Sequence, residues 1–230
     1  MTKRQGLIYN IGMKIFIASD LHGSAEYCRQ LIEAFNREQA DKLLLLGDVL
    51  YHGPRNDLPE NYSPREVLGL LEGIKNKIIC VSGNCDAEID KEILPFPVIS
   101  DFGAIFVDGL NIYFAHGHRQ EPPLLSGDVY LTGHTHVPLN AVENGHYHLG
   151  PGSLSIPKED SRHGYIVYEN RKFTFKDLSG EVYDEVEIKQ PEAVEEEPVQ
   201  QPLQEETVHE ETPVIRRPQV IRKKIIVRRR

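Results

Sequence analysis

Five short polar motifs constrain this sequence most strongly, because each of them directly follows an apolar stretch. In chain order they are Asp20-Leu21-His22, Gly47-Asp48, Gly83-Asn84-Cys85-Asp86, His116-Gly117-His118 and Gly133-His134-Thr135-His136. Their carboxylate oxygens suit Mn and Fe, and their imidazole nitrogens suit Zn, Fe, Ni and Co. One such motif alone is common as a turn after a strand. Five in series predict a site for first-row divalent metals.

The first half of the sequence predicts alternating strands and helices. The expected strands, each ending at a motif, are residues 13–19, 42–46 and 77–81. Apolar positions spaced as in an amphipathic helix occupy residues 24–38. A second helix is expected to begin after Ser63, because Pro64 suits the first helical position and Glu66 is placed to complete a capping box.

The second half predicts mainly β-hairpins. Asp108-Gly109 and Asn144-Gly145 are both typical of tight turns between antiparallel strands. The expected strands are residues 104–107, 110–115, 128–132, 164–169, 172–176 and 181–189. This order of elements indicates an α/β protein with two packed sheets and helices outside them. In such architectures ligands gather at the carboxyl ends of strands, which is where all five motifs fall.

Charge divides the 230 residues into a domain and a tail. Residues 191–213 contain eight glutamates and no lysine or arginine, and residues 214–230 contain eight lysines and arginines and no acid. The charges of these two blocks cancel, so the residues before them carry the whole net charge of −9. Residues 1–12 are either a dispensable extension or a mis-assigned start, because Met13 directly precedes the first strand. The expected plan is an extension at 1–12, a domain at 13–189, and a disordered acidic-then-basic tail at 190–230.

The composition also limits which cellular compartment and which classes of binding partner are expected. Three cysteines are an odd number and form no CxxC pair, which favours a reducing cytoplasm over a disulfide framework. No apolar run approaches the ~20 residues that span a bilayer. An acidic domain is a poor match for nucleic acid, whose binding depends on clustered positive charge. The basic end of the tail leaves open a contact with nucleic acid, membranes, ribosomes or the domain itself, and a homo-oligomer is also left open.

The identity, order and spacing of the motifs resemble those of the calcineurin-like metallophosphoesterases. More closely, three segments resemble the small bacterial phosphodiesterases of the YfcE type: GDVLYHGPRN at 47–56, GNCDAEID at 83–90 and GPGSLSIPK at 150–158. The resemblance covers residues 13–189 and implies a four-layer α/β/β/α sandwich of two mixed sheets flanked by helices. It also implies a metal-dependent phosphodiesterase in which a hydroxide bridging two metals attacks a small or nucleotide-like substrate.

The resemblance implies seven metal ligands, with Asp48 shared. The first metal would be bound by Asp20, His22, Asp48 and His136, and the second by Asp48, Asn84, His116 and His134. Asp48 can bridge because a carboxylate has two oxygens, and Asn84 adds a neutral oxygen. The histidines of GHTH stand two apart, so on an extended segment each could reach one metal of a pair ~3.5–4 Å apart. Through the metals, Asp48, Asn84 and His116 would be catalytic. We expect Mn²⁺, with Zn²⁺, Ni²⁺ or Fe²⁺ as alternatives.

Four further residues are candidates for contact with the substrate or its leaving group. His52 and Arg55 follow Asp48 along the chain, although an ordinary turn explains them equally well. His118 is expected either to contact the substrate or to contact a metal-binding residue without binding the metal itself. Cys85 stands where many family members have a histidine that protonates the leaving group. Its higher ordinary pKa, ~8.5 against ~6.5, favours diesters with good leaving groups, unless the thiol simply packs.

Two other functions compete with a phosphodiesterase. A non-catalytic scaffold is known in the retromer subunit of the superfamily, but that subunit lacks the asparagine of the GN motif, which is retained here as Asn84. A nuclease is the other alternative, since DNA-repair members share the metal centre. Those members carry extra domains that hold nucleic acid, and an acidic domain offers no basic groove.

Overall fold

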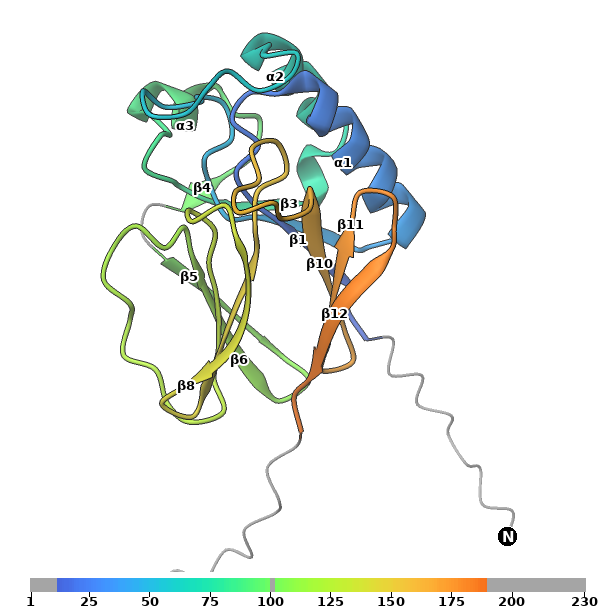
Figure 1. The fold of residues 1–230 in the computed structure, drawn as a ribbon, viewed down its shortest axis with the longest axis vertical. Coiled ribbons are helices and arrows are strands. Elements are labelled where there is room, and N and C mark those ends of the chain that lie inside the picture. The colour runs from blue at the N-terminus through green and yellow to red at the C-terminus, as the bar shows by residue number, and fades with distance from the viewer. Residues whose placement is uncertain (1–11, 100–101, 190–230) are drawn as a thin grey trace, which may run out of the picture. The chain divides into compact units, whose positions relative to one another are not determined.

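The computed structural model describes residues 12–99 and 102–189, which form two packed β-sheets with helices at one side (Figure 1). The first half runs through β1 (Ile15–Ala18), α1 (Ala25–Glu38), β2 (Lys42–Leu45), α2 (Pro64–Glu72), the 3-10 helix η1 (Lys75–Lys77), β3 (Ile78–Val81), α3 (Glu88–Ile93) and β4 (Val98–Ile99). The described part of the second half adds β5 (Phe102–Val107), β6 (Leu110–Ala115), β7 (Val129–Leu131), β8 (Pro138–Glu143), β9 (His146–Pro151), β10 (Gly164–Glu169), β11 (Lys172–Asp177) and β12 (Val182–Glu187). Helix α3 and strand β4 were not expected from the sequence.

The strand order places the ends of several parallel strands at one edge. The larger sheet has the order β12-β11-β10-β1-β2-β3-β4, in which β1 to β4 are parallel neighbours. The smaller sheet has the order β5-β6-β7-β9-β8, and β6, β7 and β9 are parallel. The parallel pairing of β6 and β7 was not expected, because such pairs usually need a helical crossover. Here an irregular loop of residues 116–128 connects them.

Alternation along β1 explains the two layers of the core. Phe16 points toward the helices and meets Phe35 of α1 at a ring-centroid distance of 6.0 Å. Ile15 and Ile17 point the other way, into the apolar cluster between the two sheets. All of these side chains are almost fully buried. Burial of each contributes about 1.5–3 kcal/mol to folding, so the central strand holds both layers together.

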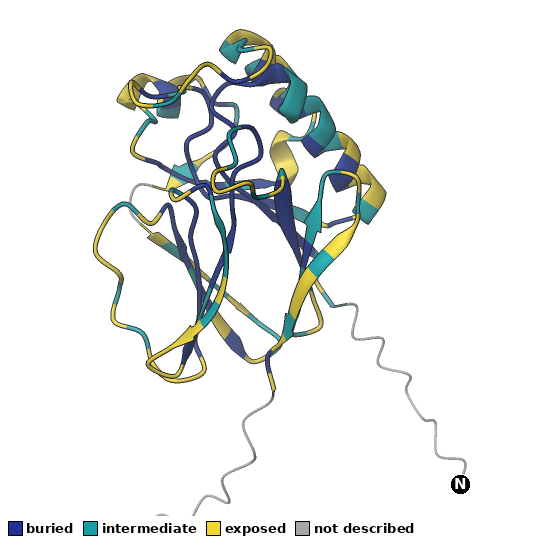
Figure 2. Ribbon diagram, in the orientation of Figure 1, coloured by how far each residue is buried: buried dark blue, intermediate teal, exposed yellow. Residues whose placement is uncertain are grey.

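Helices cover only part of the surface. Exposed residues lie on the outer sides of the helices and on the edge strands β8 and β12, whereas the central strands are buried (Figure 2). Helices α1 and α2 pack on the seven-stranded sheet. The predicted α/β class with two packed mixed sheets is therefore confirmed. Within the described residues no helix follows β4, so the second flanking helical layer is not seen there.

Helix α2 begins where the sequence predicted, but the predicted capping box is not formed. Ser63 is the N-cap residue and Pro64 the first helical residue, yet the Ser63 side chain makes no capping hydrogen bond. Its backbone carbonyl accepts hydrogen bonds from the N–H groups of Glu66 and Val67. The Glu66 carboxylate pairs instead with Arg29 of α1. A contact between two helices has thus replaced the local cap.

The predicted extensions lie almost wholly outside the described residues, since only Gly12 belongs to the part that the structure describes. The chain divides after residue 192, close to the boundary expected near Lys189. The domain plan therefore stays a prediction. Among the described residues, no helix combines the length and the apolar character needed to cross a bilayer.

Candidate metal centre

All seven predicted ligands lie on loops at one edge of the two sheets. Asp20 and His22 follow β1, Asp48 follows β2, Asn84 follows β3, His116 follows β6, and His134 and His136 follow β7. The larger sheet thus supplies the first four, and the smaller sheet supplies the three remaining histidines. Strands β1 and β7 belong to different sheets, and their carboxyl ends meet at this edge, so that His22 contacts His136, which lies 114 positions away.

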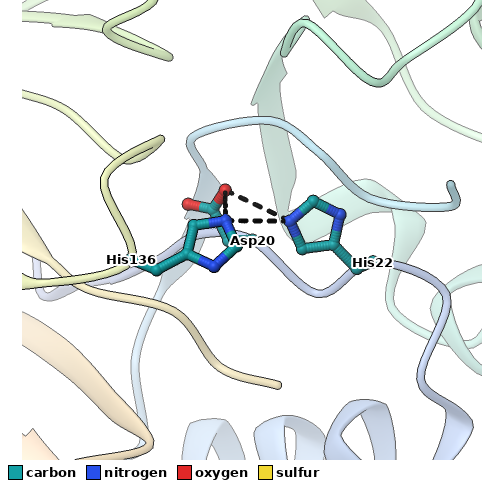
Figure 3. Close-up of side chains that lie close together, drawn as sticks. All are labelled: Asp20, His22 and His136. Carbon is teal, nitrogen blue, oxygen red and sulfur yellow. Dashed lines mark hydrogen bonds and ion pairs between the residues drawn. The ribbon is translucent and has the colours of Figure 1, made fainter. Parts of the chain in front are cut away.

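The first cluster consists of Asp20, His22 and His136, whose side chains point toward one another (Figure 3). The Asp20 Oδ1 atom lies 3.2 Å from Nε2 of His136 and 3.5 Å from Nε2 of His22. The two Nε2 atoms are themselves 3.1 Å apart. All three residues are buried. One carboxylate oxygen and two imidazole nitrogens therefore converge on a single point.

Backbone carbonyls fix the orientation of three of the histidine rings. The Nδ1 atoms of His22, His136 and His116 lie 2.8, 2.8 and 2.7 Å from the carbonyl oxygens of Tyr51, Ile156 and Leu46. A carbonyl oxygen can only accept, so each Nδ1 carries a proton and each Nε2 atom faces the interior of the site. Metal-binding histidines are commonly oriented in this way. The Nε2 atoms of His22 and His136 lie 3.1 Å apart, close enough to share one proton or to bind one cation.

The second cluster lies around His116. Its Nε2 atom is 3.1 Å from Oδ1 of Asn84 and 3.3 Å from Oδ2 of Asp48. The His134 ring approaches from β7 with its centroid 5.1 Å from that of His116. The His134 backbone N–H donates to Oδ2 of Asp20 at 3.0 Å, which ties the second cluster to the first.

Asp48 lies between the two clusters, but it uses one oxygen rather than two. Its Oδ2 atom is 3.3 Å from Nε2 of His116 and 3.8 Å from Nε2 of His22. Its Oδ1 atom instead accepts a hydrogen bond from the backbone N–H of Cys85 at 2.8 Å. The sequence reasoning relied on two free oxygens. In the structure one oxygen is held by the loop after β3, and the other faces both histidines.

The donor set fits divalent metal ions. Oδ1 of Asp20 is buried and faces Nε2 of His136 and Nε2 of His22. Two groups of three buried donors lie close enough to hold an ion, one around His136 and one around His116. Asp20 belongs to both groups. Mixed oxygen and imidazole donors suit Mn, Fe, Ni and Zn.

The backbone is strained at most of the predicted ligands. Five of the seven have left-handed φ angles between 49° and 69°: Asp20, His22, Asp48, His134 and His136. Non-glycine residues in this region cost about 1 kcal/mol or more each, although Asp and His tolerate it better than most residues. Contacts elsewhere in the loops must therefore hold the ligands in place.

Two motif glycines allow the loops to approach one another closely. A Cβ atom at Gly83 would collide with the carboxylate of Asp48. A Cβ atom at Gly133 would collide with Oγ of Ser19 and would lie 2.6 Å from Oδ2 of Asp20. The glycines of the GN and GH motifs are thus required by packing against the two aspartates, which the sequence alone did not reveal.

Asp86, for which the sequence analysis proposed no role, joins the loops after β2 and β3. Its Oδ2 atom accepts from the backbone N–H groups of Asp48 at 2.9 Å and Gly83 at 2.7 Å. Its Oδ1 atom accepts from the N–H group of Val49 at 2.8 Å. Burial raises the pKa of Asp86, and these N–H groups offset that shift only in part. Its place in GNCD, directly after Asn84 and Cys85, was the signal available in the sequence.

Two serines, also without a predicted role, hold the loop after β1. The hydroxyl groups of Ser153 and Ser155 donate to the backbone carbonyl of Asp20 at 2.8 and 3.1 Å. Both serines are buried. They belong to the segment GPGSLSIPK, which the sequence analysis used only for a resemblance. The segment therefore stabilises the left-handed conformation at Asp20.

The two aspartates and the histidines shift one another's pKa values. Burial alone would raise the pKa of Asp20, but hydrogen bonds and charges from His136, His22 and His116 hold it well below its usual range. Burial would also raise the pKa of Asp48, and the hydrogen bond from His116 lowers it. Burial alone would lower the pKa of His116, but Asp48 and Asp20 raise it to about 9. Ionised carboxylates concentrated in a buried site are complementary to cations.

A cavity of about 830 Å³ opens onto the clusters and contains some of the predicted substrate residues but not others. Arg55 and Cys85 line it, together with Lys158, which the sequence analysis did not single out. His52 is not among the lining residues, and its ring packs edge-on against Tyr51 at a centroid distance of 4.8 Å.

His118 lies away from this cavity. It lines a separate cavity of about 150 Å³ beside Tyr130, with its ring centroid 5.4 Å from that of His116. Its Nε2 atom accepts a hydrogen bond from Arg119. The structure thus places His118 next to a predicted ligand rather than at the large cavity.

These features agree with comparisons to known proteins. Residues 13–172 match the sequence profile of the calcineurin-like phosphoesterase superfamily domain. The chain therefore belongs to the calcineurin-like phosphoesterase superfamily, and the predicted enzyme class, a metal-dependent phosphoesterase, is confirmed.

Two curated relatives are similar in sequence. Phosphodiesterase YfcE of Escherichia coli (strain K12) is 39% identical over 162 residues, which cover 69% of this chain and 88% of the relative. Phosphodiesterase MJ0936 of Methanocaldococcus jannaschii is 32% identical over 135 residues, which cover 54% of this chain and 74% of the relative. The chain thus spans most of the length of both.

Solved structures confirm the fold. The structure of Yfce, a phosphoesterase from E. coli, matches with a TM-score of 0.74 at 36% identity and covers 77% of this chain and 100% of its own. Vacuolar Protein Sorting 29 from Cryptosporidium parvum matches with a TM-score of 0.52 at 21% identity, over 76% of this chain and 98% of its own. The second likeness shows the shared fold alone.

Proposed function

We propose that this chain is a dinuclear phosphodiesterase that hydrolyses a small or nucleotide-like phosphodiester. The observation that carries the proposal is the position of Asp48, whose Oδ2 atom faces His22 on one side and His116 on the other. A carboxylate oxygen between two sets of inward-pointing donors is what a bridged metal pair needs. The printed names of both curated relatives support a phosphodiester as the substrate.

The proposed cofactors are two divalent ions, with Mn²⁺ expected first and Zn²⁺, Ni²⁺ or Fe²⁺ as alternatives. The first would be held by Asp20, His22, Asp48 and His136, and the second by Asp48, Asn84, His116 and His134. When bound, the ions supply Lewis-acid activation of water and neutralise charge on the phosphate oxygens. The carbonyl groups behind His22, His116 and His136 keep the Nε2 atoms of these ligands directed inward.

Cys85 supports a diester substrate with a good leaving group. Burial, followed by the nearby charge of Asp48, raises the pKa of the Cys85 thiol to about 12. The thiol therefore stays neutral near pH 7 and is a weak proton donor. An aryl or similarly stable leaving group departs without a proton, whereas an alkoxide needs one. Cys85 lines the large cavity, where a leaving group would contact it.

The proposed setting is a reducing cytoplasm, in agreement with the free state of Cys28, Cys80 and Cys85. A small substrate is favoured because a cavity of about 830 Å³ lies within the range of small-molecule sites.

The test is metal removal and replacement. Chelated protein should lose hydrolysis of bis(p-nitrophenyl) phosphate and recover it with Mn²⁺. Asp48→Asn should abolish recovery and reduce the bound metal, because the oxygen shared by the two clusters is altered. Asp57→Asn, an exposed aspartate in the following loop, is the matched control and should behave as the wild type. Full diesterase activity in metal-free protein or in Asp48→Asn would refute the proposal. Metal binding without any hydrolysis would favour the scaffold, and cleavage confined to DNA would favour the nuclease.

A further inference from the structure

Two positively charged side chains line the large cavity without any countercharge. Arg55 belongs to the loop after β2, and Lys158 ends the segment GPGSLSIPK after β9. Both residues are exposed, and neither side chain forms a hydrogen bond or ion pair within the described residues. Most other cations of the described domain are paired, as Arg29 is with Glu66 and Lys176 with Glu38.

The acids that line the same cavity cannot serve as partners. Asp48 is engaged by the backbone of Cys85 and by the histidines of both clusters. Asp86 accepts three backbone hydrogen bonds, and within the described residues it forms no ion pair with a lysine or arginine. Arg55 and Lys158 are thus unpaired charges at the entrance to a site in an acidic domain. Such charges attract and orient an anionic ligand.

Backbone contacts fix the main-chain positions of Lys158 and Arg55 on different sides of the ligand clusters. The Lys158 backbone N–H donates to the carbonyl of His136 at 3.2 Å, so Lys158 flanks the first cluster. The Arg55 loop is held by a hydrogen bond from Asn56 to the carbonyl of His52 at 2.8 Å. The same loop packs on Cys85, because a Cβ atom at Gly53 would lie 2.7 Å from its Sγ atom. A ligand bound at the clusters would therefore extend between the two cations.

A simple phosphodiester does not need these cations. It carries a single negative charge, which two divalent ions at the clusters would already neutralise. An arginine and a lysine together are well suited to a phosphate group, because the guanidinium can bind it in a bidentate manner and the ammonium adds a point charge.

We infer that the substrate carries a second anionic group, a terminal phosphate on one ester arm, and that Arg55 and Lys158 bind it. The inference rests on the proposed phosphodiesterase function and adds a substrate class to it. Arg55 and Lys158 are specificity-determining residues in this scheme, because they contact the distal phosphate and not the phosphorus under attack. The cavity volume leaves room for such an arm beside the scissile group.

The experiment uses the Mn²⁺-loaded full chain and two matched aryl phosphodiesters. Both have a p-nitrophenyl leaving group, and the second arm is a propyl chain that ends either in a phosphate or in a neutral hydroxyl. Wild-type protein should show at least about a tenfold higher kcat/KM for the phosphate-ended substrate, as expected for charge-assisted hydrogen bonds. Lys158→Ala and Arg55→Ala should each remove most of this preference, because they lower kcat/KM for the phosphate-ended substrate far more than for the neutral one. Lys189→Ala, a lysine outside the cavity, is the control and should keep the preference.

A charge reversal separates binding from a merely structural role. Lys158→Glu should disfavour the phosphate-ended arm and gain activity on an arm that ends in a trimethylammonium group. Binding of the corresponding non-hydrolysable phosphonates, measured by calorimetry, gives the same comparison without turnover. If the neutral diester is hydrolysed but the wild type shows no preference, or if the variants keep the preference, the inference is wrong while the proposed function stands. If neither diester is hydrolysed, the proposed function fails, and the calorimetric preference still decides whether Arg55 and Lys158 bind the distal phosphate.

Discussion

Replacing Asp86 tests whether the loops that carry the ligands are held by the three hydrogen bonds that its carboxylate accepts. Asp86→Ala would leave the backbone N–H groups of Asp48, Val49 and Gly83 without their acceptor. An unsatisfied buried donor costs about 1–2 kcal/mol, and water can reach part of this half-buried site. We therefore expect a loss of about 2–4 kcal/mol in the free energy of unfolding. Asp86→Asn keeps one oxygen acceptor, so it should lose about half as much.

The measurements are urea unfolding followed by circular dichroism and Mn²⁺ binding by calorimetry. Because the β2 and β3 loops position Asp48 and Asn84, Asp86→Ala should also weaken Mn²⁺ binding by about 10–100-fold, the range typical of residues that orient ligands. Asp57→Ala, in an exposed part of the β2 loop, controls for loss of a negative charge. A destabilisation below about 0.5 kcal/mol with unchanged metal affinity would refute the assignment of Asp86 as the link between the loops.

Three further predictions concern the site and its scaffold. Cys85→Ala should keep most of the kcat/KM for an aryl diester. Cys85→His should selectively improve kcat/KM for alkyl esters, because imidazole is a better acid near neutrality. Loss of aryl diester hydrolysis in folded, metal-loaded Cys85→Ala would contradict this prediction. Gly133→Ala should greatly reduce the metal content of the protein, measured by elemental analysis, because the new Cβ atom would displace the Asp20 carboxylate. Normal metal content would instead show that the loop can shift to accept the Cβ atom. Burial alone would raise the pKa of Glu38, but the hydrogen bonds from Lys176 and Tyr165 lower it. The stability it contributes is therefore full above the ordinary glutamate pKa and is lost as pH falls through the depressed value. Glu38→Gln should cost about 1–2 kcal/mol in urea unfolding at pH 7 and clearly less at pH 3, and an equal cost at both would contradict the assignment.

The elements with local signals were predictable from the sequence. Strand β2 ends at Leu45, just before Gly47-Asp48, and the β5–β6 hairpin turns at Asp108-Gly109, both close to what the sequence predicted. The convergence of the motifs after β1, β2 and β3 was also predictable, because parallel strands end at one edge. These inferences needed only periodicity and turn chemistry. The parallel pairing of β6 and β7, which brings in the last two motifs, was not expected.

The features that could not be predicted depend on contacts between distant segments. The Ser63 capping box failed because Glu66 found a partner on another helix. Only one Asp48 oxygen faces the histidines, because the other accepts a hydrogen bond from the Cys85 backbone N–H. A pattern of side chains in the sequence cannot predict such a hydrogen bond from the backbone. The place of Lys158 at the cavity depends on how the loop after β9 returns to His136. Sequence spacing carries no information about such tertiary partners.

The left-handed backbone at five of the predicted ligands means that folding and function favour different residues there. Glycine adopts this conformation without the steric cost that Asp and His incur. A chain optimised only for thermal stability would therefore drift toward glycine at positions such as Asp20 and His136. The ligating side chains at these positions therefore serve the site at a cost to the stability of the fold. A homologue with glycine there would have gained stability by giving up its chemistry, and stability-guided redesign of this chain should leave these positions untouched.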